Sequence, residues 1–492
     1  MTDRPLTLRA VGEVLRSAGL LRDVRGSGDV AVMGVCQDSR LARRGDLFLA
    51  WKGSRSDAHA FVGQAVEAGA VAAVVEHPVD ADLPQLVVSD GRRAAAVAAH
   101  HVLGSPSERM MVVGITGTNG KTTTALLVRH LLALRGPAAA VGTLGVVDAD
   151  GVRPGTEGLT TPGPVQVAVW LRDLADDGIR AVAMEASSHA LDQHRLDGVH
   201  FAAGVFTNLT QDHLDYHGDL ERYFTAKARL VELVAPDGWV VVNRDEGAWD
   251  ALTPLGRRLR TFAVNAEADV RAEGVTLGAD GSRFTLRMDG RVAPVHLPLL
   301  GSYNVENALA AAAVAALAGL DVEDIAAGLA SAPQVKGRLE RVSQVPCTVL
   351  IDFAHTPDAL EGALGAVKPL TQGRLVVVFG AGGDRDRAKR LPMAEAVRRH
   401  ADVVVLTSDN PRTEDPEQIL DDLAAGLEGI EYTRLVDRRA AIKHALGVAR
   451  DGDTVVLAGK GHETYQDIGG TKRPFDERAV VQTCLAELGM VP

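Results

Sequence analysis

The segment GITGTNGKTTT (114–124) has the residue types of a loop that binds nucleotide phosphates. The apolar segment MMVVGIT (110–116) predicts a strand that leads into it, and a helical pattern begins at Lys121. Gly117 and Gly120 allow a tight turn between strand and helix, so that backbone N–H groups and the helix N-terminus point at an anion. These features predict a phosphate-binding loop.

Lys121 and Thr122 indicate the chemistry of this loop. The lysine adds positive charge beside the β- and γ-phosphates, and the threonine hydroxyl is suited to bind Mg²⁺. The common P-loop pattern has its first glycine at position 115, whereas Gly114 stands one residue earlier here. The alternative is a glycine-rich turn before an ordinary helix. The loop alone does not distinguish a ligase from a kinase, a motor or a switch.

Two later segments carry candidate metal ligands where strands are predicted to end. AVAMEASSHALDQHRL (181–196) places Glu185 at the end of its strand. FTNLTQDHLDYHG (206–218) gathers acidic and histidine side chains, namely Asp212, His213, Asp215 and His217. Hard cations prefer oxygen ligands, which makes Glu185 a candidate for Mg²⁺. The alternatives are a carboxylate at a helix N-terminus for Glu185 and an exposed acidic turn for the second segment. Lys227, taken by itself, is typical of a solvated helical lysine.

The composition narrows the class of protein. The chain has 492 residues, a net charge of −12 and no long basic run, which argues against nucleic acid as a partner. Its three cysteines are far apart and form no CxxC pair, which favours a reducing cytoplasm over a disulfide scaffold. No signal peptide is indicated, and the apolar run at 308–318 is too short for a membrane span.

Short β-branched runs alternate with longer helical patterns, which predicts an α/β fold with mainly parallel sheets. Strands are predicted at 110–116, 181–186, 201–207, 238–243, 347–353, 374–380, 402–408 and 453–459, and a helix at 121–135. The segment 270–301 alternates and turns like antiparallel hairpins. Two seams predict three domains, at 1–108, 109–334 and 335–492.

With these features in view, the chain resembles the Mur ligases, which use ATP to add amino acids to the peptidoglycan precursor. The motifs that carry the resemblance are GTNGKTTT (117–124), MEASSHALDQHR (184–195), FTNLTQDHLDYHG (206–218), YFTAKARL (223–230), GSYNVENALAA (301–311), GRLE (337–340), IDFAHTPDAL (351–360), FGAGGDRDRAKR (379–390), SDNPRTEDP (408–416) and AGKGHETYQ (458–466). The resemblance implies a small N-terminal α/β domain, a central P-loop-type ATPase domain and a C-terminal Rossmann-like domain.

The resemblance also implies a mechanism and a set of residues for ATP and Mg²⁺. ATP phosphorylates a substrate carboxylate, and an amine then displaces phosphate from the acyl phosphate. The residues that match ATP-binding positions are Gly117, Thr118, Asn119, Gly120, Lys121, Thr122, Thr123, Asn304, Asn307, Arg338 and Asp352. Those implied in catalysis or metal binding are Lys121, Thr122, Glu185, His213 and Lys227, the last as a carbamylated lysine. For Asn304 and Asn307, a helix cap is the alternative.

Two further sets match substrate positions of the family. Ser39, Thr160, Thr161, Ser187, Gln193 and Arg195 match contacts to the UDP-N-acetylmuramoyl-dipeptide. Arg385, Asp409, Asn410, Pro411, Arg412, Gly459 and Glu463 match contacts to meso-diaminopimelate. The guanidinium of Arg412 suits the distal carboxylate, which lysine lacks. Without the resemblance, LTTPG (159–163) is a plain turn and DNPR (409–412) an exposed one.

We therefore expect a monomeric, cytoplasmic ligase that adds meso-diaminopimelate to the muramoyl-dipeptide. The alternatives are a lysine-adding Mur ligase, a ligase like the folylpolyglutamate synthetases, and a non-catalytic P-loop switch. The switch has no need of Glu185, His213 and Lys227 together with an amino-acid site.

Overall fold

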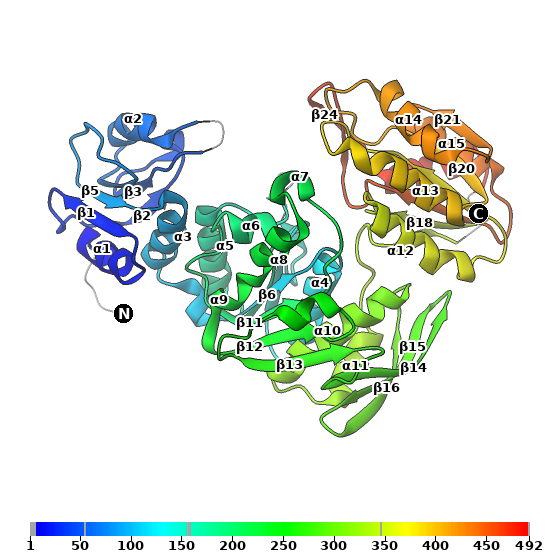
Figure 1. Ribbon diagram of the computed structural model, residues 1–492, viewed down its shortest axis with the longest axis horizontal. Helices are drawn as coiled ribbons and strands as arrows, with labels where there is room; N and C mark the ends of the chain where they lie inside the picture. The colour runs from blue at the N-terminus through cyan, green and yellow to red at the C-terminus, as the bar shows by residue number, and fades with distance from the viewer. Residues whose placement is uncertain (1–5, 54–55, 154, 156–158, 345–346, 491–492) are drawn as a thin grey trace. The chain divides into compact units, whose positions relative to one another are not determined.

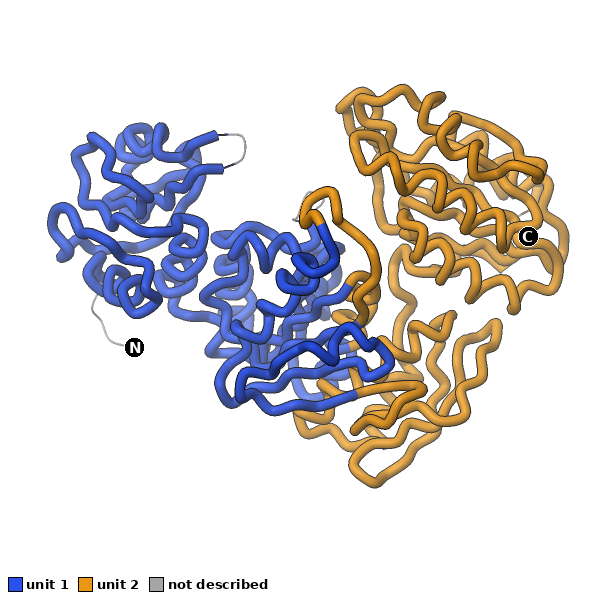
Figure 2. The backbone as a smooth tube through the Cα atoms, in the orientation of Figure 1, with its two compact units in different colours: residues 1–117, 128–207, 219–261 blue, residues 118–127, 208–218, 262–492 orange. Residues whose placement is uncertain are grey.

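The computed structural model describes residues 6–53, 56–153, 155, 159–344 and 347–490. These divide into two compact units, shown in Figure 2, of which one holds residues 1–117, 128–207 and 219–261 and the other 118–127, 208–218 and 262–492. The predicted α/β class with mainly parallel sheets is confirmed. The predicted three-domain division stays a prediction. No helix among the described residues is long and apolar enough to cross a membrane.

The first unit begins with a small sheet in the strand order β1-β5-β4-β3-β2. Its strands are β1 (Leu21–Arg25), β5 (Gln85–Val88), β4 (Ala72–Val75), β3 (Asp46–Leu49) and β2 (Gly34–Cys36), all parallel to their neighbours except β1. Successive side chains of β3 point to opposite faces of the sheet, so that Leu47 and Leu49 pack against helices α1 (Leu8–Ser17) and α3 (Gly91–Val102). Phe48 packs on the other face with α2 (Val62–Glu67).

The same unit contains the parallel strands that carry the phosphate loop. Their order is β12 (Val234–Asn243), β11 (Phe201–Phe206), β6 (Met111–Thr116), β10 (Ala181–Glu185) and β7 (Ala138–Gly142). Beyond β7 the sheet continues with two short antiparallel strands, β8 (Gly145–Val147) and β9 (Val152–Arg153). All of β6 beyond its first residue is buried, as is typical of parallel strands covered on both faces.

The strand register brings the carboxyl ends of β6, β10 and β11 to the same edge of the sheet. Glu185 at the end of β10 pairs with Ile115, and Phe206 at the end of β11 pairs with Thr116. The chain leaving β6 therefore emerges between the ends of its two neighbours, where open α/β sheets bind their ligands. This unit also contains four helices that are labelled in Figure 1, namely α5 (Pro164–Asp176), α6 (Ser188–Asp192), α8 (Leu220–Ala228) and α9 (Leu230–Leu233).

The second unit contains the predicted hairpins and a buried alanine-rich helix. β14 (Val270–Gly278), β15 (Gly281–Met288) and β16 (Arg291–Leu297) pair antiparallel, so the hairpin prediction for 270–301 is confirmed. Helices α10 (Ser302–Leu317) and α11 (Val322–Ala330) follow them. The interior of α10 is buried, which explains its apolar run without a membrane. The short helix α7 (Leu214–His217) and the first residues of α4 (Lys121–Leu132) also belong to this unit.

The C-terminal sheet of the second unit has the order β17-β18-β22-β19-β20-β21. The strands are β17 (Glu340–Ser343), β18 (Thr348–Asp352), β22 (Thr454–Ala458), β19 (Leu375–Phe379), β20 (Val403–Thr407) and β21 (Tyr432–Leu435), and only β17 pairs antiparallel. Helices α12 (Pro357–Val367), α13 (Arg390–His400) and α14 (Pro416–Ala424) cover one face, and α15 (Arg438–Val448) and α16 (Glu477–Glu487) the other (Figure 1). A separate hairpin joins β23 (Tyr465–Ile468) and β24 (Thr471–Pro474).

The predicted strands agree with the observed ones, with small differences at their ends. The helix expected at 121–135 ends at Leu132, and the strand expected at 238–243 already begins at Val234. In both cases the hydrophobic pattern located the element, whereas its ends depend on local turns.

Candidate functional site

The phosphate loop has the predicted strand–loop–helix geometry. β6 ends at Thr116 and α4 begins at Lys121. Gly117 and Gly120 adopt φ values of +152° and +83°, which side chains rarely permit. A Cβ at Gly120 would lie only 2.3 Å from the Oδ1 atom of Asn307, so glycine is required here for space as well as for conformation.

The loop residues after Gly117 are held by the segment that follows β11. The Thr118 hydroxyl donates to the carbonyl oxygen of Thr210 at 3.1 Å, and the Thr210 N–H donates back to it at 3.0 Å. The N–H of Asn119 donates to the Asn208 side chain at 2.8 Å, and Lys121 Nζ donates to the Thr118 carbonyl at 2.8 Å. The lysine therefore lies folded over its own loop. Thr122 and Thr123 are buried.

Asn304 and Asn307 connect the alanine-rich helix to the phosphate loop's helix. The Thr124 hydroxyl donates to Asn307 Oδ1 at 3.1 Å, and the Asn307 amide donates to Asn304 Oδ1 at 3.0 Å. Asn304 in turn donates to the carbonyl oxygen of Leu300 at 2.7 Å. The helix cap of α10 is Gly301, so the capping alternative is wrong for both asparagines. Their buried chain of hydrogen bonds fixes α10 against the start of α4.

Arg338 and Asp352 lie together on the second unit. Arg338 Nη2 is 3.3 Å from the Thr122 hydroxyl, and its guanidinium lies 4.9 Å from the centre of the Phe353 ring. Asp352 is buried and accepts the N–H groups of Leu339 at 2.6 Å and Ala354 at 2.8 Å. Burial raises the pKa of Asp352, and the charge of Arg338 and these hydrogen bonds oppose that rise.

Glu185 is a buried carboxylate at the end of β10. It is 2% exposed and accepts the N–H of Thr143 at 2.8 Å and its hydroxyl at 3.2 Å. A Cβ at Gly142 would lie 2.2 Å from Glu185 Oε1, so the bare glycine leaves room for the carboxylate. The side chain that caps α6 is Ser187, whose hydroxyl accepts the N–H of Ala190. Glu185 thus stands two residues before the cap of α6, and its carboxylate binds Thr143, which follows the neighbouring strand β7.

The residues expected to contact the muramoyl-dipeptide surround the same strand end. The Thr161 hydroxyl donates to the Glu185 carbonyl at 2.7 Å and accepts the Ser187 N–H at 3.1 Å. Arg195 donates to the Thr161 carbonyl at 2.9 Å and to the Gln193 side chain at 2.7 Å. The LTTPG segment is thus more than a plain turn, because it connects β10 with the segment after α6.

Thr160 and Ser39 complete that set. The Thr143 hydroxyl is 3.4 Å from that of Thr160. Ser39 is buried in the N-terminal part of the chain, where its hydroxyl donates to the Gln64 side chain at 2.8 Å. A Cβ at Gly163 would lie 3.7 Å from Gln37 Nε2, which places the Thr160 loop beside the segment that carries Ser39.

His213 lies in a strained turn. Its φ of +55° is in the left-handed region, and its side chain is 45% exposed, with Nε2 3.3 Å from the Asp212 carboxylate. Burial raises the pKa of Asp212, but the positive charges of His213, His355, Lys389 and Lys121 outweigh burial and hold it below its usual range. The acidic and histidine segment therefore carries an ionised carboxylate among cationic groups.

Lys227 is buried within α8, with 1% of its surface exposed. Its Nζ donates to the Gly117 carbonyl at 2.8 Å and lies 4.3 Å from the centre of the Tyr223 ring. The solvated-lysine alternative is therefore wrong. The side chain reaches the first residue of the phosphate loop.

The residues expected to contact the amino acid come from loops after three adjacent parallel strands. Arg385 follows β19, Asn410 and Arg412 follow β20, and Gly459 and Glu463 follow β22. The Asn410 amide donates to Glu463 at 2.8 Å. A Cβ at Gly459, where φ is +118°, would lie 2.3 Å from Asp409 Oδ2, so this glycine gives the carboxylate its space. Asp409, Asn410 and Pro411 are buried, whereas Arg385 is exposed and Arg412 partly so.

Sequence reasoning missed Lys460, which is fully buried in this cluster. Its Nζ donates to Asn410 Oδ1 and Glu463 Oε2, both at 3.0 Å. Because Lys460 binds the Oδ1 atom of Asn410, the amide nitrogen of Asn410 is the atom that faces Glu463. The lysine stands in AGKGHE between Gly459 and Glu463, so its position was the one available signal.

Among the described residues, no group of three or more His, Cys, Asp or Glu side chains could hold a metal by itself. Mg²⁺ commonly uses one or two protein oxygens and takes its remaining ligands from phosphates and water. Glu185 and the Thr122 hydroxyl are the hard oxygen donors in the predicted set, and both are buried.

The chain is similar to known proteins over nearly its whole length. The pattern of the Mur ligase middle domain matches residues 115–315, and that of the Mur ligase glutamate ligase domain matches residues 337–461. It is 41% identical over 477 residues to the UDP-N-acetylmuramoyl-L-alanyl-D-glutamate--2,6-diaminopimelate ligase of Geobacillus kaustophilus, covering 95% of this chain and 97% of that one. It is 44% identical over 483 residues to the ligase of the same name from Geobacter sulfurreducens, covering 92% and 94%. A solved structure of a ligase with that name is 32% identical, with a TM-score of 0.72 and coverage of 99% and 100%.

Proposed function

Because the chain belongs to the Mur ligase family, we propose that it joins 2,6-diaminopimelate to UDP-N-acetylmuramoyl-L-alanyl-D-glutamate and cleaves ATP to ADP and phosphate. It is an amide-bond ligase of peptidoglycan precursor synthesis. The observation that carries the choice of amino acid is the identity above 40% with diaminopimelate ligases over more than nine-tenths of the chain. The presence of both the arginine of DNPR and Glu463 agrees with a substrate that has both a carboxylate and an ammonium at its distal end.

The chemistry requires activation of a carboxylate. An ionised carboxylate does not react with an amine at neutral pH, because its oxygen is a poor leaving group. Transfer of the γ-phosphoryl group of ATP to the substrate carboxylate gives ADP and an acyl phosphate. The amine of diaminopimelate then attacks the acyl carbon, and phosphate leaves the tetrahedral intermediate. The protein contributes position and charge neutralisation.

We assign the phosphate loop to the nucleotide. Backbone N–H groups of 117–120 and the start of α4 would bind the phosphates, with Lys121 as the point charge. Arg338 reaches the Thr122 hydroxyl, and Asn307 leaves no space for a side chain at Gly120, so both shape this loop.

The metal site is assigned by donor chemistry. Thr122 and Glu185 would each provide an oxygen to Mg²⁺, and His213 would provide a nitrogen to a second ion. The ions, when bound, would neutralise the charge that develops on the transferred phosphoryl group. As an unmodified ammonium Lys227 would repel such an ion, whereas a carbamate on the same nitrogen would carry anionic oxygens. We propose that modification, and its support is the burial of Lys227 against Gly117.

The two remaining sets are assigned to the substrates. The carboxylate-bearing dipeptide would contact Thr160, Thr161, Ser187, Gln193 and Arg195, with Ser39 toward the uridine end. Meso-diaminopimelate would contact Arg385, Asp409, Asn410, Pro411, Arg412, Gly459 and Glu463. We further propose that the ligase acts as a monomer in the cytoplasm, in keeping with three buried cysteines that form no disulfide.

The proposal is tested by phosphate release. The purified chain with ATP and Mg²⁺ should release phosphate at a steady rate only when both the UDP-muramoyl-dipeptide and diaminopimelate are present. Steady release with neither substrate would favour the P-loop switch. Release with a folate and glutamate, and none with both proposed substrates, would favour a ligase like the folylpolyglutamate synthetases.

A further inference from the structure

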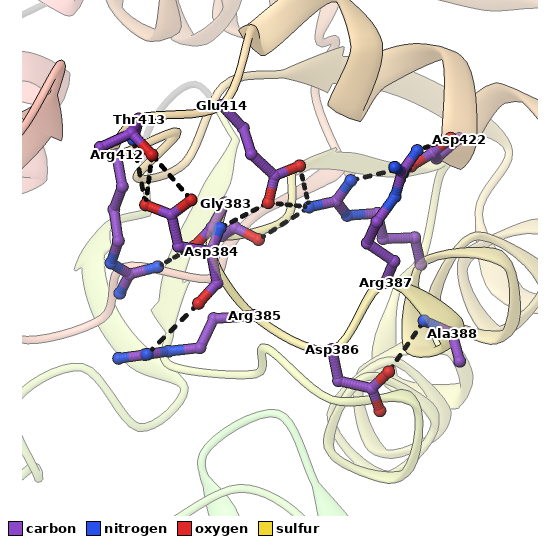
Figure 3. Close-up of polar contacts among 12 residues, drawn as sticks. Gly383, Asp384, Arg385, Asp386, Arg387, Ala388, Arg412, Thr413, Glu414 and Asp422 are labelled. Atoms are coloured by element: carbon purple, nitrogen blue, oxygen red, sulfur yellow. Dashed lines mark hydrogen bonds and ion pairs between the residues drawn. The ribbon is translucent and has the colours of Figure 1, made fainter. Parts of the chain in front are cut away.

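Two loops in the C-terminal sheet lie against each other beside the proposed amino-acid site. Loop 380–386 follows β19 and loop 408–414 follows β20, and these strands are parallel neighbours. The Gly383 N–H donates to the Asn410 carbonyl at 2.9 Å. Arg412 Nη1 donates to the Gly383 carbonyl at 2.6 Å (Figure 3). The two proposed substrate arginines, Arg385 and Arg412, thus stand on different loops that touch.

Both loops contain a residue in the left-handed region. Asp384 has a φ of +51° and Arg412 a φ of +53°, and neither is glycine. Such conformations persist only where surrounding contacts hold them, and they concentrate at functional sites. For Arg412 the backbone is held by the hairpin β23–β24, since its N–H donates to the Asp467 carbonyl at 3.0 Å and its carbonyl accepts the Gly469 N–H at 2.6 Å.

The Asp384 carboxylate links the loops through Thr413. The Thr413 hydroxyl lies 2.9 Å and 3.0 Å from the two carboxylate oxygens, and the Thr413 N–H donates to the carboxylate at 3.1 Å (Figure 3). These hydrogen bonds, followed by the charges of Arg412 and Arg385, lower the pKa of Asp384. The Asp384 carboxylate is therefore ionised and is held against Thr413, the residue that follows Arg412.

A second link joins the same loops to the helix α13. Glu414 accepts the N–H of Asp384, and its two carboxylate oxygens accept Arg390 Nη2 at 3.0 Å and 2.8 Å. Arg390 is 1% exposed and also donates to Asp422 on α14 at 2.8 Å. A buried arginine with two carboxylate partners does not move easily, so this link gives the pair of loops a rigid base.

We propose that Thr413 and Asp384, backed by Glu414, are positioning residues that fix Arg412 relative to Arg385 and thereby set the preference for an amino acid with a second carboxylate. The inference rests on the proposed function. Two guanidinium groups repel each other, and desolvation together with the charge of Arg412 lowers the pKa of Arg385 although much of its side chain is exposed. Without the cross-loop links the arginines would separate, and a distal carboxylate would lose its fixed donors.

The test compares Thr413→Val with Thr413→Ser. Valine has nearly the shape of threonine without the hydroxyl, and serine retains the hydroxyl. Steady-state kinetics with meso-diaminopimelate and with L-lysine as acceptors should show that Thr413→Val raises the KM for diaminopimelate by about five- to ten-fold. This is less than the full loss of a hydrogen bond to a charged group, because the Thr413 N–H still donates to the Asp384 carboxylate when the hydroxyl is removed. The value of kcat, the KM values for ATP and for the UDP-muramoyl-dipeptide, and the kcat/KM for lysine should each change less than about two-fold. Thr413→Ser should behave like the wild type.

Thr483→Val is a matched control, because Thr483 is exposed on α16 and its hydroxyl donates within that helix, to the carbonyl of Ala479. Asp384→Asn provides a second variant if Thr413→Val proves unstable, and it should show the same selective rise in KM. An unchanged KM for diaminopimelate in Thr413→Val would overturn the inference, as would an equal loss for every substrate. Failure of the wild type to use diaminopimelate would instead refute the proposed function.

Discussion

Arg412 offers the sharpest test of how the amino acid is recognised. The perturbation is Arg412→Ala, measured with meso-diaminopimelate and with L-lysine, which lacks the distal carboxylate. Arg412 Nη1 is engaged by the Gly383 carbonyl at 2.6 Å, which leaves other N–H groups of the guanidinium for the substrate. Alanine meets the same left-handed backbone strain as arginine does, so the substitution chiefly removes the side chain.

The magnitude follows from the hydrogen bond between the guanidinium and the distal carboxylate, which alanine cannot form. A hydrogen bond to a charged group contributes about 1.5–3 kcal/mol, which corresponds to a decrease of roughly 10- to 150-fold in kcat/KM for diaminopimelate. Lysine makes no such interaction, so its kcat/KM should fall by less than about three-fold. Arg412→Lys should recover only part of the decrease, since an ammonium cannot form the paired hydrogen bonds of a guanidinium.

The assay is coupled detection of ADP with the acceptor varied at saturating ATP and UDP-muramoyl-dipeptide. The cycle of two enzymes and two acceptors isolates the arginine–carboxylate interaction from any general damage. Equal losses for diaminopimelate and lysine would refute the assignment, because they would show that Arg412 acts on something both substrates share. Wild-type kcat/KM for diaminopimelate in Arg412→Ala would refute it outright.

Three further outcomes are expected. Lys227→Met should abolish phosphate release while the melting temperature stays within a few degrees, because methionine fills the buried space without the nitrogen; retained turnover would contradict the assignment. Burial lowers the pKa of His100 to about 3, so between about pH 6.5 and pH 3 the unfolded state binds a proton that the folded state does not, and the stability of the protein should fall as the pH drops through that range. In His100→Gln the melting temperature should fall less steeply with pH over the same range, and an unchanged slope would contradict this explanation. Burial raises the pKa of Cys36 to about 12 and that of Cys347 to about 11, so a thiol reagent at pH 8 should label them only after denaturation, and rapid labelling of the native protein would contradict their burial.

The sequence was sufficient for the elements that have strong patterns. Apolar β-branched runs located four strands in each of the two larger sheets but not β7 or β21, and the glycines with Lys121 located the phosphate loop. The candidate residues were placed where strands end, and open α/β sheets bind their ligands at the carboxyl ends of their strands. Register within the first unit agrees, since Glu185 pairs with Ile115 two residues before the loop begins.

Other features could not be read from single positions. A lysine on a helix is usually solvated, and only the packing of α8 shows that Lys227 is buried against Gly117. The same holds for Lys460, whose partners are the adjacent Glu463 and the distant Asn410. The cross-loop contact between Asp384 and Thr413 joins residues 29 positions apart, and it depends on β19 and β20 being neighbours. Such contacts are tertiary, and no local pattern encodes them.

The proposed reaction couples ATP cleavage to the formation of one amide bond with diaminopimelate. This coupling is measured by mixing the purified chain with ATP, Mg²⁺, UDP-N-acetylmuramoyl-L-alanyl-D-glutamate and equal concentrations of meso-diaminopimelate and L-lysine, and following the products by mass spectrometry together with ADP. We expect the diaminopimelate tripeptide to dominate and to accumulate in equal amount to ADP. A dominant lysine product, or ADP formed without any tripeptide, would contradict the proposed reaction.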